Sequence, residues 1–299
     1  MKASVIVVTF NRAPILVHCI DKLLNQSVDD YEVIVVDDGS TDGTEDLIKK
    51  IDDKRVLYLK NEKNMGQPFS RNRGIKIANG EVIIFVDSDV LVHKNFVEDH
   101  LKIHERNDKL IVQGLVRHIR DIKDYNKMNL KIDGLCLSGL VTQNVSVRRK
   151  WLLEVGGLDE SFGTIMGYED IELGRRLKGI GLKTVYSWRR CLAWHMDGRE
   201  TDERLESVFN KAFMFGRNAV KFSRMYGKKV AMRHLKKNYV FFINKILGTE
   251  YWVEKKGLNY LKTHKNGFSY PILKWIIKYY YRGKGIKEAL KEEGSIYDY

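Results

Sequence analysis

Proline and cysteine are both scarce in this sequence, and each scarcity excludes a class of protein. The 299 residues contain only 3 prolines and 3 cysteines, without a low-complexity tract or an internal repeat. Cys19, Cys136 and Cys191 are widely spaced and form no Cys-x-x-Cys pair, so the sequence predicts neither a disulfide framework nor a zinc knuckle. Such cysteine usage favours a reducing cytoplasm.

Long apolar runs and glycine-rich phosphate loops are also missing. The longest uncharged run lies between Asp133 and Arg148 and spans 14 residues, which is too short and too polar to cross a bilayer. Met1 and Lys2 lead directly into an apolar strand, so no secretory signal is predicted. No Gly-x-Gly-x-x-Gly motif follows the first strand, and no Gly-x-x-x-x-Gly-Lys motif occurs, which argues against a dinucleotide site and a P-loop.

Positive charge is in excess, but only in one part of the chain. The formal net charge is +13, and residues 211–291 hold 20 Lys and Arg against 3 Asp and Glu. This region therefore carries +17 and the remainder carries −4. Membrane headgroups, a nucleic acid or an acidic glycan would each suit such a region.

Four short apolar segments in the first part of the chain are typical of strands. They are Ser4–Phe10, Tyr31–Val36, Val56–Leu59 and Val82–Val86. Segments with helical spacing lie between them, which predicts an α/β domain with a mostly parallel central sheet flanked by helices.

Polar residues follow three of these strands at the point where each ends. They are Thr9–Arg12, Asp37–Ser40 and Asp87–Asp89. Ligands of open parallel sheets bind outside the carboxyl ends of the strands, so we expect these residues to share one site. Asp87-Ser88-Asp89 alone has two interpretations, because it suits both a polar turn and a Mg²⁺ or Mn²⁺ site built from oxygen ligands. The neighbouring polar strand ends favour the metal site.

The second half of the domain offers further candidates, each with a structural explanation. His100 and His104 lie one turn apart on a predicted helix at 94–107, where a solvated face is favoured over a metal site. Glu169 and Asp170 begin another predicted helix, where carboxylates favour the positive dipole end, or where one of them acts as a general base. His195 beside a tryptophan is more often packed than liganding. The remaining predictions here are strands at Ile111–Ile119, Val141–Val147 and Lys183–Trp188 and a surface pair of Glu172 with Arg176.

The basic C-terminal region is predicted to be helical, beginning with a long helix at 203–226. Beyond it, aromatic residues and lysines interleave, as in Tyr239–Phe242, Tyr251-Trp252 and Trp275–Arg282. A membrane-interface helix, a binding surface for single-stranded nucleic acid and a subdomain with its aromatics packed inward all fit this pattern.

The order and spacing of four motifs resemble the family 2 glycosyltransferases, which are inverting nucleotide-sugar enzymes of the GT-A fold. The motifs are Val8–Arg12, Val36–Asp42, Gly66–Asn72 and Asp87–Asp89. A fifth stretch, Gly156–Leu177, is similar to the acceptor half of galactosyltransferase-like members, in which Gly-Trp-Glu-Asp is common. Tyr168 stands in place of that tryptophan here, so an aromatic contact with the acceptor is expected and the sugar preference is open.

The resemblance implies a division of the chain and a reaction. Residues 1–200 would form the GT-A domain, with a nucleotide-sugar half at 1–120 and an acceptor half at 121–200. Residues 201–299 lie outside the resemblance and would form the basic, aromatic-rich helical region. The implied reaction is metal-dependent transfer of a hexose, with inversion, from a UDP-sugar to a hydroxyl of a glycan or lipid-linked acceptor in cell-surface polysaccharide or glycolipid synthesis.

Roles in binding the donor follow from the same resemblance. Asp38 would hydrogen-bond the uracil, with Asp37 nearby and with Thr9 and Arg12 in the same site. Arg71 would contact the nucleotide or its phosphates, where a planar guanidinium suits bidentate binding. The other implied donor-site residues are Phe10, Asn11 and Ser88.

The resemblance also assigns the metal and the base. Asp89 would bind Mn²⁺ or Mg²⁺, Asp87 would face the ribose or share the metal, and His195 is a further candidate ligand. Asp170 would take the proton of the acceptor hydroxyl, with Glu169 as the alternative base.

The protein is therefore expected in the cytoplasm, at the inner face of the cell membrane, where its basic region would touch anionic lipid and no nucleic acid. Two alternatives are a nucleotidyltransferase with a similar nucleotide site and a non-catalytic protein that binds a membrane or a nucleic acid.

Overall fold

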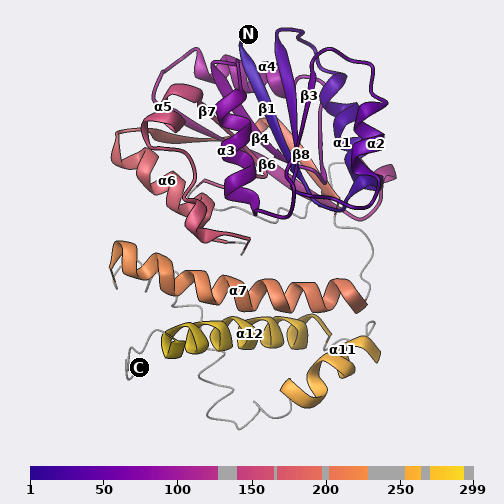
Figure 1. Cartoon of the computed structure of the whole chain (residues 1–299), viewed down its shortest axis with the longest axis vertical. Helices are drawn as coiled ribbons and strands as arrows, with labels where there is room; N and C mark the ends of the chain where they lie inside the picture. The colour runs from indigo at the N-terminus through magenta and orange to yellow at the C-terminus, as the bar shows by residue number, and fades with distance from the viewer. Residues whose placement is uncertain (127–139, 165–166, 197–201, 228–252, 264–269, 293–299) are drawn as a thin grey trace. The chain divides into compact units, whose positions relative to one another are not determined.

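The computed structural model divides the chain into two compact units, which are described separately (Figure 1). The first unit comprises residues 1–164 and 169–199, and the second comprises residues 165–168 and 200–299. The structure describes residues 1–126, 140–164, 167–196, 202–227, 253–263 and 270–292. Cys136, Tyr239–Phe242 and Tyr251-Trp252, which the sequence singled out, lie outside these residues.

An eight-stranded sheet forms the centre of the first unit, in the order β3-β2-β1-β4-β7-β6-β8-β5. Strands β1 to β4 are parallel, as the sequence predicted, whereas β7 runs antiparallel to β4 and β6. At the far edge of the sheet, β8 runs parallel to β6, and the edge strand β5 runs antiparallel to β8. The strands are β1 (Ala3–Thr9), β2 (Tyr31–Asp37), β3 (Val56–Lys60), β4 (Val82–Asp87), β5 (Val90–Val92), β6 (Leu110–Ile119), β7 (Asn144–Arg148) and β8 (Lys183–Met196).

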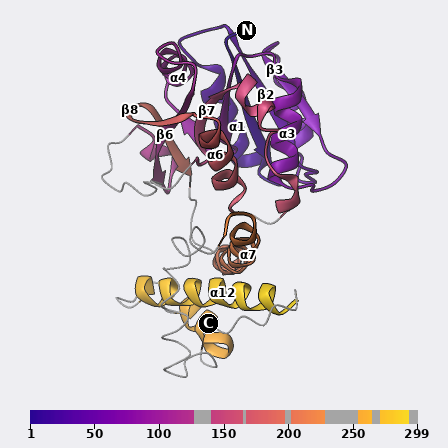
Figure 2. The ribbon, with the colours of Figure 1, turned by 90° about the vertical axis from the view of Figure 1, so that its left-hand side faces the viewer.

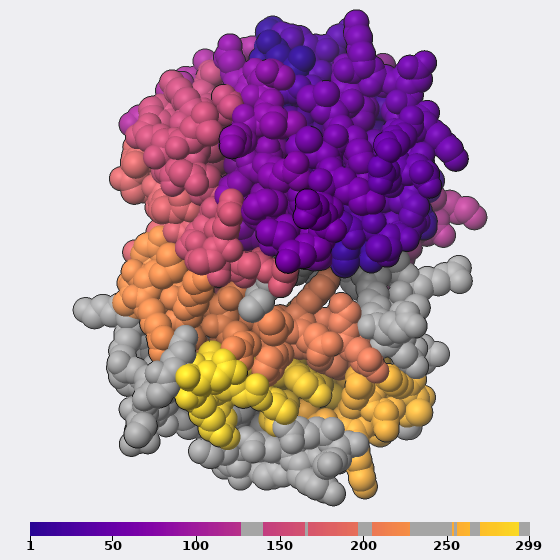
Figure 3. All heavy atoms as spheres, in the orientation of Figure 1, coloured from indigo at the N-terminus to yellow at the C-terminus, as the bar shows by residue number. Residues whose placement is uncertain are grey.

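Helices cover both faces of this sheet, because alternate strand residues point to opposite faces and both sets are apolar (Figure 2). On one face, α1 (Ala13–Leu24) and α4 (Phe96–His104) pack on the side of Val5 and Val7. On the other face, α3 (Gln67–Ile77), α5 (Arg149–Glu154) and α6 (Glu169–Gly179) pack on the side of Ile6. In the space-filling view of Figure 3, the atoms of the first unit form a continuous surface on the side turned to the viewer. The shorter elements are α2 (Thr44–Lys49) and two 3-10 turns, Ile122–Asp124 and Glu160–Phe162.

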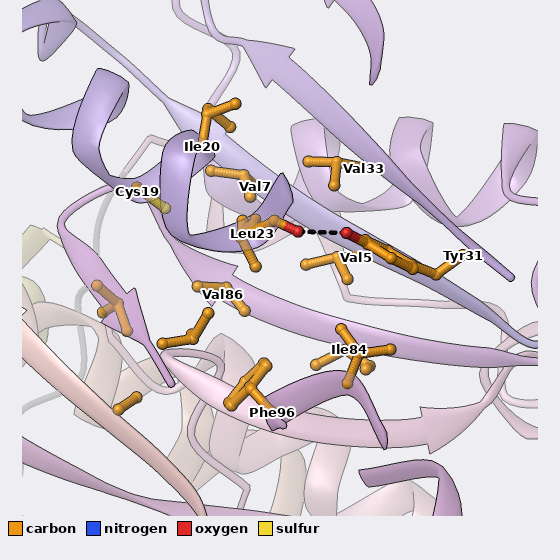
Figure 4. Close-up of a cluster of buried hydrophobic side chains, with 14 of the residues drawn as sticks. Val5, Val7, Cys19, Ile20, Leu23, Tyr31, Val33, Ile84, Val86 and Phe96 are labelled. Carbon is orange, nitrogen blue, oxygen red and sulfur yellow. Dashed lines mark hydrogen bonds between the residues drawn. The ribbon is translucent and has the colours of Figure 1, made fainter. Parts of the chain in front are cut away.

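The apolar core between the sheet and helices α1 and α4 includes a buried polar contact, shown in Figure 4. The hydroxyl of Tyr31, at the start of β2, donates a hydrogen bond of 2.6 Å to the backbone carbonyl of Leu23 in the last turn of α1. A buried carbonyl without a partner would be costly, so this bond completes the end of α1 inside the core.

Two expectations for surface residues were wrong. His100 and His104 are buried, and both hydrogen-bond the hydroxyl of Ser146 on β7, at 2.8 and 2.9 Å. Burial lowers the pKa of His100 to about 3 and that of His104 to about 4, so both are neutral at pH 7. Glu172 is also buried, and its two carboxylate oxygens accept bonds of 2.7 and 2.6 Å from Arg176. Helical spacing showed that the residues of each pair share one face of a helix, but it did not show that this face is buried in the fold.

The second unit is built on two long helices, α7 (Asp202–Tyr226) and α12 (Tyr270–Glu292). The long helix predicted at 203–226 is thus confirmed. A π-helical turn at Val253–Gly257 leads into α11 (Leu258–Thr263), and these elements share an apolar cluster with α7 and α12. Within the described parts of the chain, none of the helices combines the length and apolarity needed to cross a membrane.

Glycines allow α7 and α12 to approach closely. A Cβ atom on Gly216 of α7 would overlap the backbone oxygen of Arg282, and one on Gly285 of α12 would overlap the backbone oxygen of Phe213. Each glycine thus meets the main chain of the facing helix, which cannot rotate away as a side chain could.

We therefore expect Gly216→Ala and Gly285→Ala each to lower the free energy of unfolding by about 1–3 kcal/mol, because the helices must separate to admit a methyl group. Gly179→Ala is the control, since a Cβ there meets nothing within 4 Å. Urea unfolding followed by circular dichroism would measure the effect. Equal stability of all three variants would contradict the close approach.

Candidate functional site

The polar residues at the strand ends lie side by side, as expected for parallel strands. In the register of the sheet, Thr9 of β1 pairs with Asp37 of β2, and Val8 pairs with Asp87 of β4. Strand pairing alone therefore places these three strand ends at one edge of the sheet. The hydroxyl of Thr9 is buried there and has no hydrogen-bond partner among the described residues.

Asp38, expected to read the uracil, is engaged by the protein itself. Its Oδ1 accepts bonds from the side chains of Asn61 at 2.7 Å and Ser70 at 2.9 Å and from the backbone N–H of Met65 at 2.8 Å. Its Oδ2 accepts a bond of 2.9 Å from the backbone N–H of Gly66. A carboxylate offers about four lone-pair sites, so most of its capacity is used to fasten the loop that begins α3.

Asp37 and the loop after β1 are also tied to their surroundings. Asp37 is buried and accepts bonds from the backbone N–H of Ser40 at 2.8 Å and from the hydroxyl of Tyr58 at 2.7 Å. Asn11 has a left-handed backbone with φ of 51°, and its side chain accepts a bond of 2.8 Å from the backbone N–H of Thr41. These bonds fix the two loops to each other. Phe10, by contrast, is exposed, and Ser88 is buried.

Asp89 is brought to His195 by strand pairing that the sequence did not predict. Strand β8 extends beyond the predicted Trp188 to Met196, and β5 pairs with it so that Val90 lies opposite His195. As a result, His195 Nε2 lies 3.3 Å from Asp89 Oδ2, which also accepts a hydrogen bond from Arg12. Burial alone would raise the pKa of Asp89, but His195 and Arg12 outweigh it and lower the pKa to about 2.

This corner has the donor chemistry of a divalent-metal site. It holds the ionised carboxylate of Asp89 and an imidazole nitrogen 3.3 Å from it. The carboxylate of Asp87, two residues earlier at the end of β4, accepts a hydrogen bond from Arg71. Mg²⁺ and similar ions are commonly held by one or two carboxylates together with substrate phosphates, so a small protein ligand set fits. Across the described residues, no group of three or more His, Cys, Asp or Glu is arranged to hold an ion.

Arg71 joins the strand ends to the acid pair at 169–170. Its side chain is 3% exposed and lies between two carboxylates. Nη2 donates a bond of 3.1 Å to Asp87 Oδ1, and Nη1 lies 3.9 Å from Glu169 Oε1. Nη1 is buried and makes no hydrogen bond within the described part of the chain.

Glu169 and Asp170 have different surroundings although they are adjacent. Glu169 is buried and lies near Arg71, whereas Asp170 is half-buried and bonds only its neighbour's backbone N–H among the described hydrogen bonds. Burial and the negative charge of Glu169 raise the pKa of Asp170 to about 7. A carboxyl group whose surroundings raise its pKa toward neutrality is typical of acid–base sites.

Sequence reasoning missed a residue that fastens α3 to the segment after α5. Asn72 of α3 donates a bond of 2.9 Å to the backbone oxygen of Leu158 and accepts one of 2.8 Å from the N–H of the same residue. A Cβ on Gly157 would overlap the Asn72 side chain, so a glycine there permits this contact. In the sequence, Asn72 and the distant Gly156-Gly157-Leu158 stretch could have suggested this contact, but nothing in the residue pattern pairs them.

Tyr168 does not have the expected acceptor-facing position. It belongs to the second unit, is 1% exposed, and its ring lies 4.5 and 5.1 Å from those of Phe215 and Phe222. Its hydroxyl accepts a bond of 3.1 Å from Arg282. Tyr168 is thus a core residue.

Comparison with known proteins establishes the class. The family model for glycosyl transferase family 2 matches residues 4–159, so this chain belongs to that family and is a transferase. It is 28% identical over 242 residues to the uncharacterized glycosyltransferase YfnE of Bacillus subtilis, a match that covers 61% of this chain and 62% of YfnE. The chain spans less than two thirds of the length of such curated relatives. Family membership favours glycosyl transfer over the nucleotidyltransferase alternative.

Solved structures establish the fold as GT-A. The mannosyltransferase PcManGT from Pyrobaculum calidifontis, solved with GDP-Man and Mn²⁺, matches with a TM-score of 0.65 and 17% identity over 98% of this chain and 88% of that one. Residues 1–349 of S. aureus TarS, solved with UDP, match with a TM-score of 0.59 and 18% identity over 100% of this chain and 93% of that one.

The Asp38 contacts predict a large stability effect. Asp38→Ala removes the acceptor of four hydrogen bonds, three of them buried, so we expect the free energy of unfolding to fall by about 2–4 kcal/mol. Asp52→Ala, at an exposed aspartate of the same unit, is the control. Thermal unfolding and UDP titration together would measure it. Loss of UDP affinity with unchanged stability would instead support direct recognition of the base by Asp38.

Proposed function

We propose that this protein transfers a hexose from a UDP-sugar to a hydroxyl of a glycan or lipid-linked acceptor, with inversion, in cell-surface polysaccharide or glycolipid synthesis. The observation that carries the proposal is the chain of contacts Asp87–Arg71–Glu169, followed directly by Asp170, whose pKa is raised to about 7. It links the donor-side strand ends to a carboxyl group suited to proton transfer at neutral pH.

The donor would bind along the carboxyl ends of β1, β2 and β4. Asp37 and Asp38 hold the loops that would surround the nucleotide base. Thr9 offers a hydroxyl that has no hydrogen-bond partner among the described residues, and Asp87 would face the ribose. Arg12 and Arg71 supply planar guanidinium groups for phosphate oxygens. The UDP complex of TarS supports a uridine donor, and the GDP-Man complex of PcManGT leaves the base to be tested.

Asp170 would act as the general base. It accepts the proton of the acceptor hydroxyl, whose oxygen forms a bond to the anomeric carbon while the bond from that carbon to the diphosphate oxygen breaks. The nucleotide diphosphate leaves with the electron pair, and the single displacement inverts the centre. Glu169 is the alternative base, but its position beside Arg71 better suits holding that guanidinium in place.

Asp89, with His195 and Asp87 as further ligands, would hold Mn²⁺ or Mg²⁺. A bound ion supplies a positive charge that stabilises the leaving diphosphate. The low pKa of Asp89 keeps its carboxylate ionised and able to serve as a ligand at any physiological pH.

The basic C-terminal region would place the enzyme at an anionic surface. The charge of +17 in residues 211–291 supports peripheral association with the inner face of the cell membrane, where a lipid-linked acceptor is found.

Asp170→Asn is expected to lower kcat by roughly 10²–10⁴-fold without weakening donor binding, because the amide cannot accept the proton. Release of nucleotide diphosphate from a panel of UDP-, GDP- and TDP-sugars with Mn²⁺ would identify the donor and measure kcat. The base must be ionised, so kcat/KM of the wild type should rise with pH through about 7 and then level off. Near-normal turnover by Asp170→Asn would rule out this base.

Metal binding can be tested apart from turnover. We expect Asp89→Asn to weaken Mn²⁺ binding in the presence of UDP by at least about tenfold, measured by electron paramagnetic resonance. Asp99→Asn is a matched control, because Asp99 pairs with His93 at 3.5 Å elsewhere in the first unit. Full activity in excess EDTA would contradict the role of Asp89.

A further inference from the structure

One face of α12 exposes large apolar side chains although its opposite face is packed. Ile277 and Tyr280 are buried in the cluster that α12 shares with α7 and α11. Ile272 and Trp275 are 57% and 51% exposed, and the ring of the half-buried Tyr279 lies 4.8 Å from that of Trp275, tilted by 49°. Their spacing of three and four residues places them on one face of the helix.

Positive charges border this face. Lys278 lies three residues beyond Trp275 and is therefore beside it on the helix. Lys274 lies one turn before Lys278, with its ammonium group 5.9 Å from the ring of Tyr270. Partial desolvation, and after it the nearby positive charges of Lys274 and Arg282, lower the pKa of the exposed Lys278. An anionic surface laid against this edge would offset their repulsion.

An apolar strip with an aromatic centre and a lysine border matches the chemistry of a bilayer interface. Trp and Tyr favour the headgroup level, where one part of the ring is apolar and another is wet. Lysine stems can lie along the apolar boundary while their ammonium groups reach anionic headgroups. Single-stranded nucleic acid would use the aromatic rings but has no use for Ile272.

We propose that the Trp275 face, consisting of Ile272, Trp275 and Tyr279 with Lys274 and Lys278 at its border, docks on an anionic lipid surface. This rests on the proposed membrane-associated function and names the surface responsible. The helix lies in the interface plane, since α12 is neither apolar enough nor free enough of charge to cross a bilayer.

The full-length protein is tested by co-sedimentation with vesicles of phosphatidylglycerol and phosphatidylcholine in equal parts, and with pure phosphatidylcholine, at low salt. Trp275→Ala should weaken binding to the anionic vesicles by roughly tenfold, through loss of the aromatic anchor. Trp188→Ala is the matched control, because Trp188 is 45% exposed on β8 of the first unit and should bind as the wild type does.

The charge requirement is tested with a second pair of variants. Lys274→Gln with Lys278→Gln should weaken binding by about fivefold for each lysine removed. Lys50→Gln with Lys76→Gln removes the same charge from exposed positions of the first unit and should have little effect. Thermal unfolding and slow donor hydrolysis, measured for every variant, should match the wild type.

The possible failures are distinguishable. Absence of wild-type binding to anionic vesicles would overturn membrane association as a whole and leave the proposed transfer reaction standing. Equal binding by wild type, Trp275→Ala and Trp188→Ala would overturn the Trp275 face alone. Loss of single-stranded RNA binding in Trp275→Ala, with vesicle binding intact, would overturn it in favour of a nucleic-acid surface.

Discussion

A buried guanidinium, that of Arg71, is the constraint on which the candidate site depends. An enclosed cation requires anionic partners, because its desolvation would otherwise be prohibitive. Asp87 supplies one partner from the end of β4, and Glu169 supplies the other from the start of α6. These residues lie far apart in the sequence, so the ion pairs join the parallel half of the sheet to the segment that carries Asp170. Moving Asp87 would remove the carboxylate that Arg71 hydrogen-bonds and would leave only the 3.9 Å contact with Glu169.

The same constraint separates the roles of the two acids at the start of α6. Glu169 lies near the cation and adds negative charge beside Asp170. Asp170 is partly removed from water and makes no described ion pair, so its proton is held more tightly. Burial and the neighbouring carboxylate of Glu169 thus together raise the pKa of Asp170. An acid that is half ionised near pH 7 is well matched to accepting a proton under physiological conditions.

The sequence predicted those parts of the site that depend on strand ends. Parallel neighbouring strands have their carboxyl ends at the same edge of the sheet, so the sequence alone predicted that Thr9, Asp37 and Asp87 lie close together. The Asp89–His195 contact was expected only from the family resemblance. The residue pattern does not predict it, because the contact requires β8 to continue past Trp188 and to pair with the three-residue strand β5. A strand that passes through Trp188-Arg189-Arg190 has no apolar alternation by which to recognise it.

Burial was the quantity that residue patterns predicted least well. His100, His104 and Glu172 are polar residues on helices, and a pattern alone assigns such residues to water. Each is enclosed because a specific partner on another residue, Ser146 or Arg176, completes its hydrogen bonds. Ser146 is far from the two histidines along the chain, so that contact leaves no periodic signal. The Glu172–Arg176 pair does have helical spacing, but spacing does not show that the fold buries Glu172.

The chain therefore places charge in two physically different ways. In the first unit, enclosed charges have fixed partners, and geometry matters as much as sign. A lysine at position 71 would carry the same charge but has no planar fork with which to contact Asp87 and Glu169 together. On α12, charge lies along an apolar strip, and a surface of many headgroups can meet a lysine or an arginine in many arrangements. Exchange of one cation for another should thus be severe at Arg71 and mild at Lys278, because only the first site depends on the direction of its hydrogen bonds.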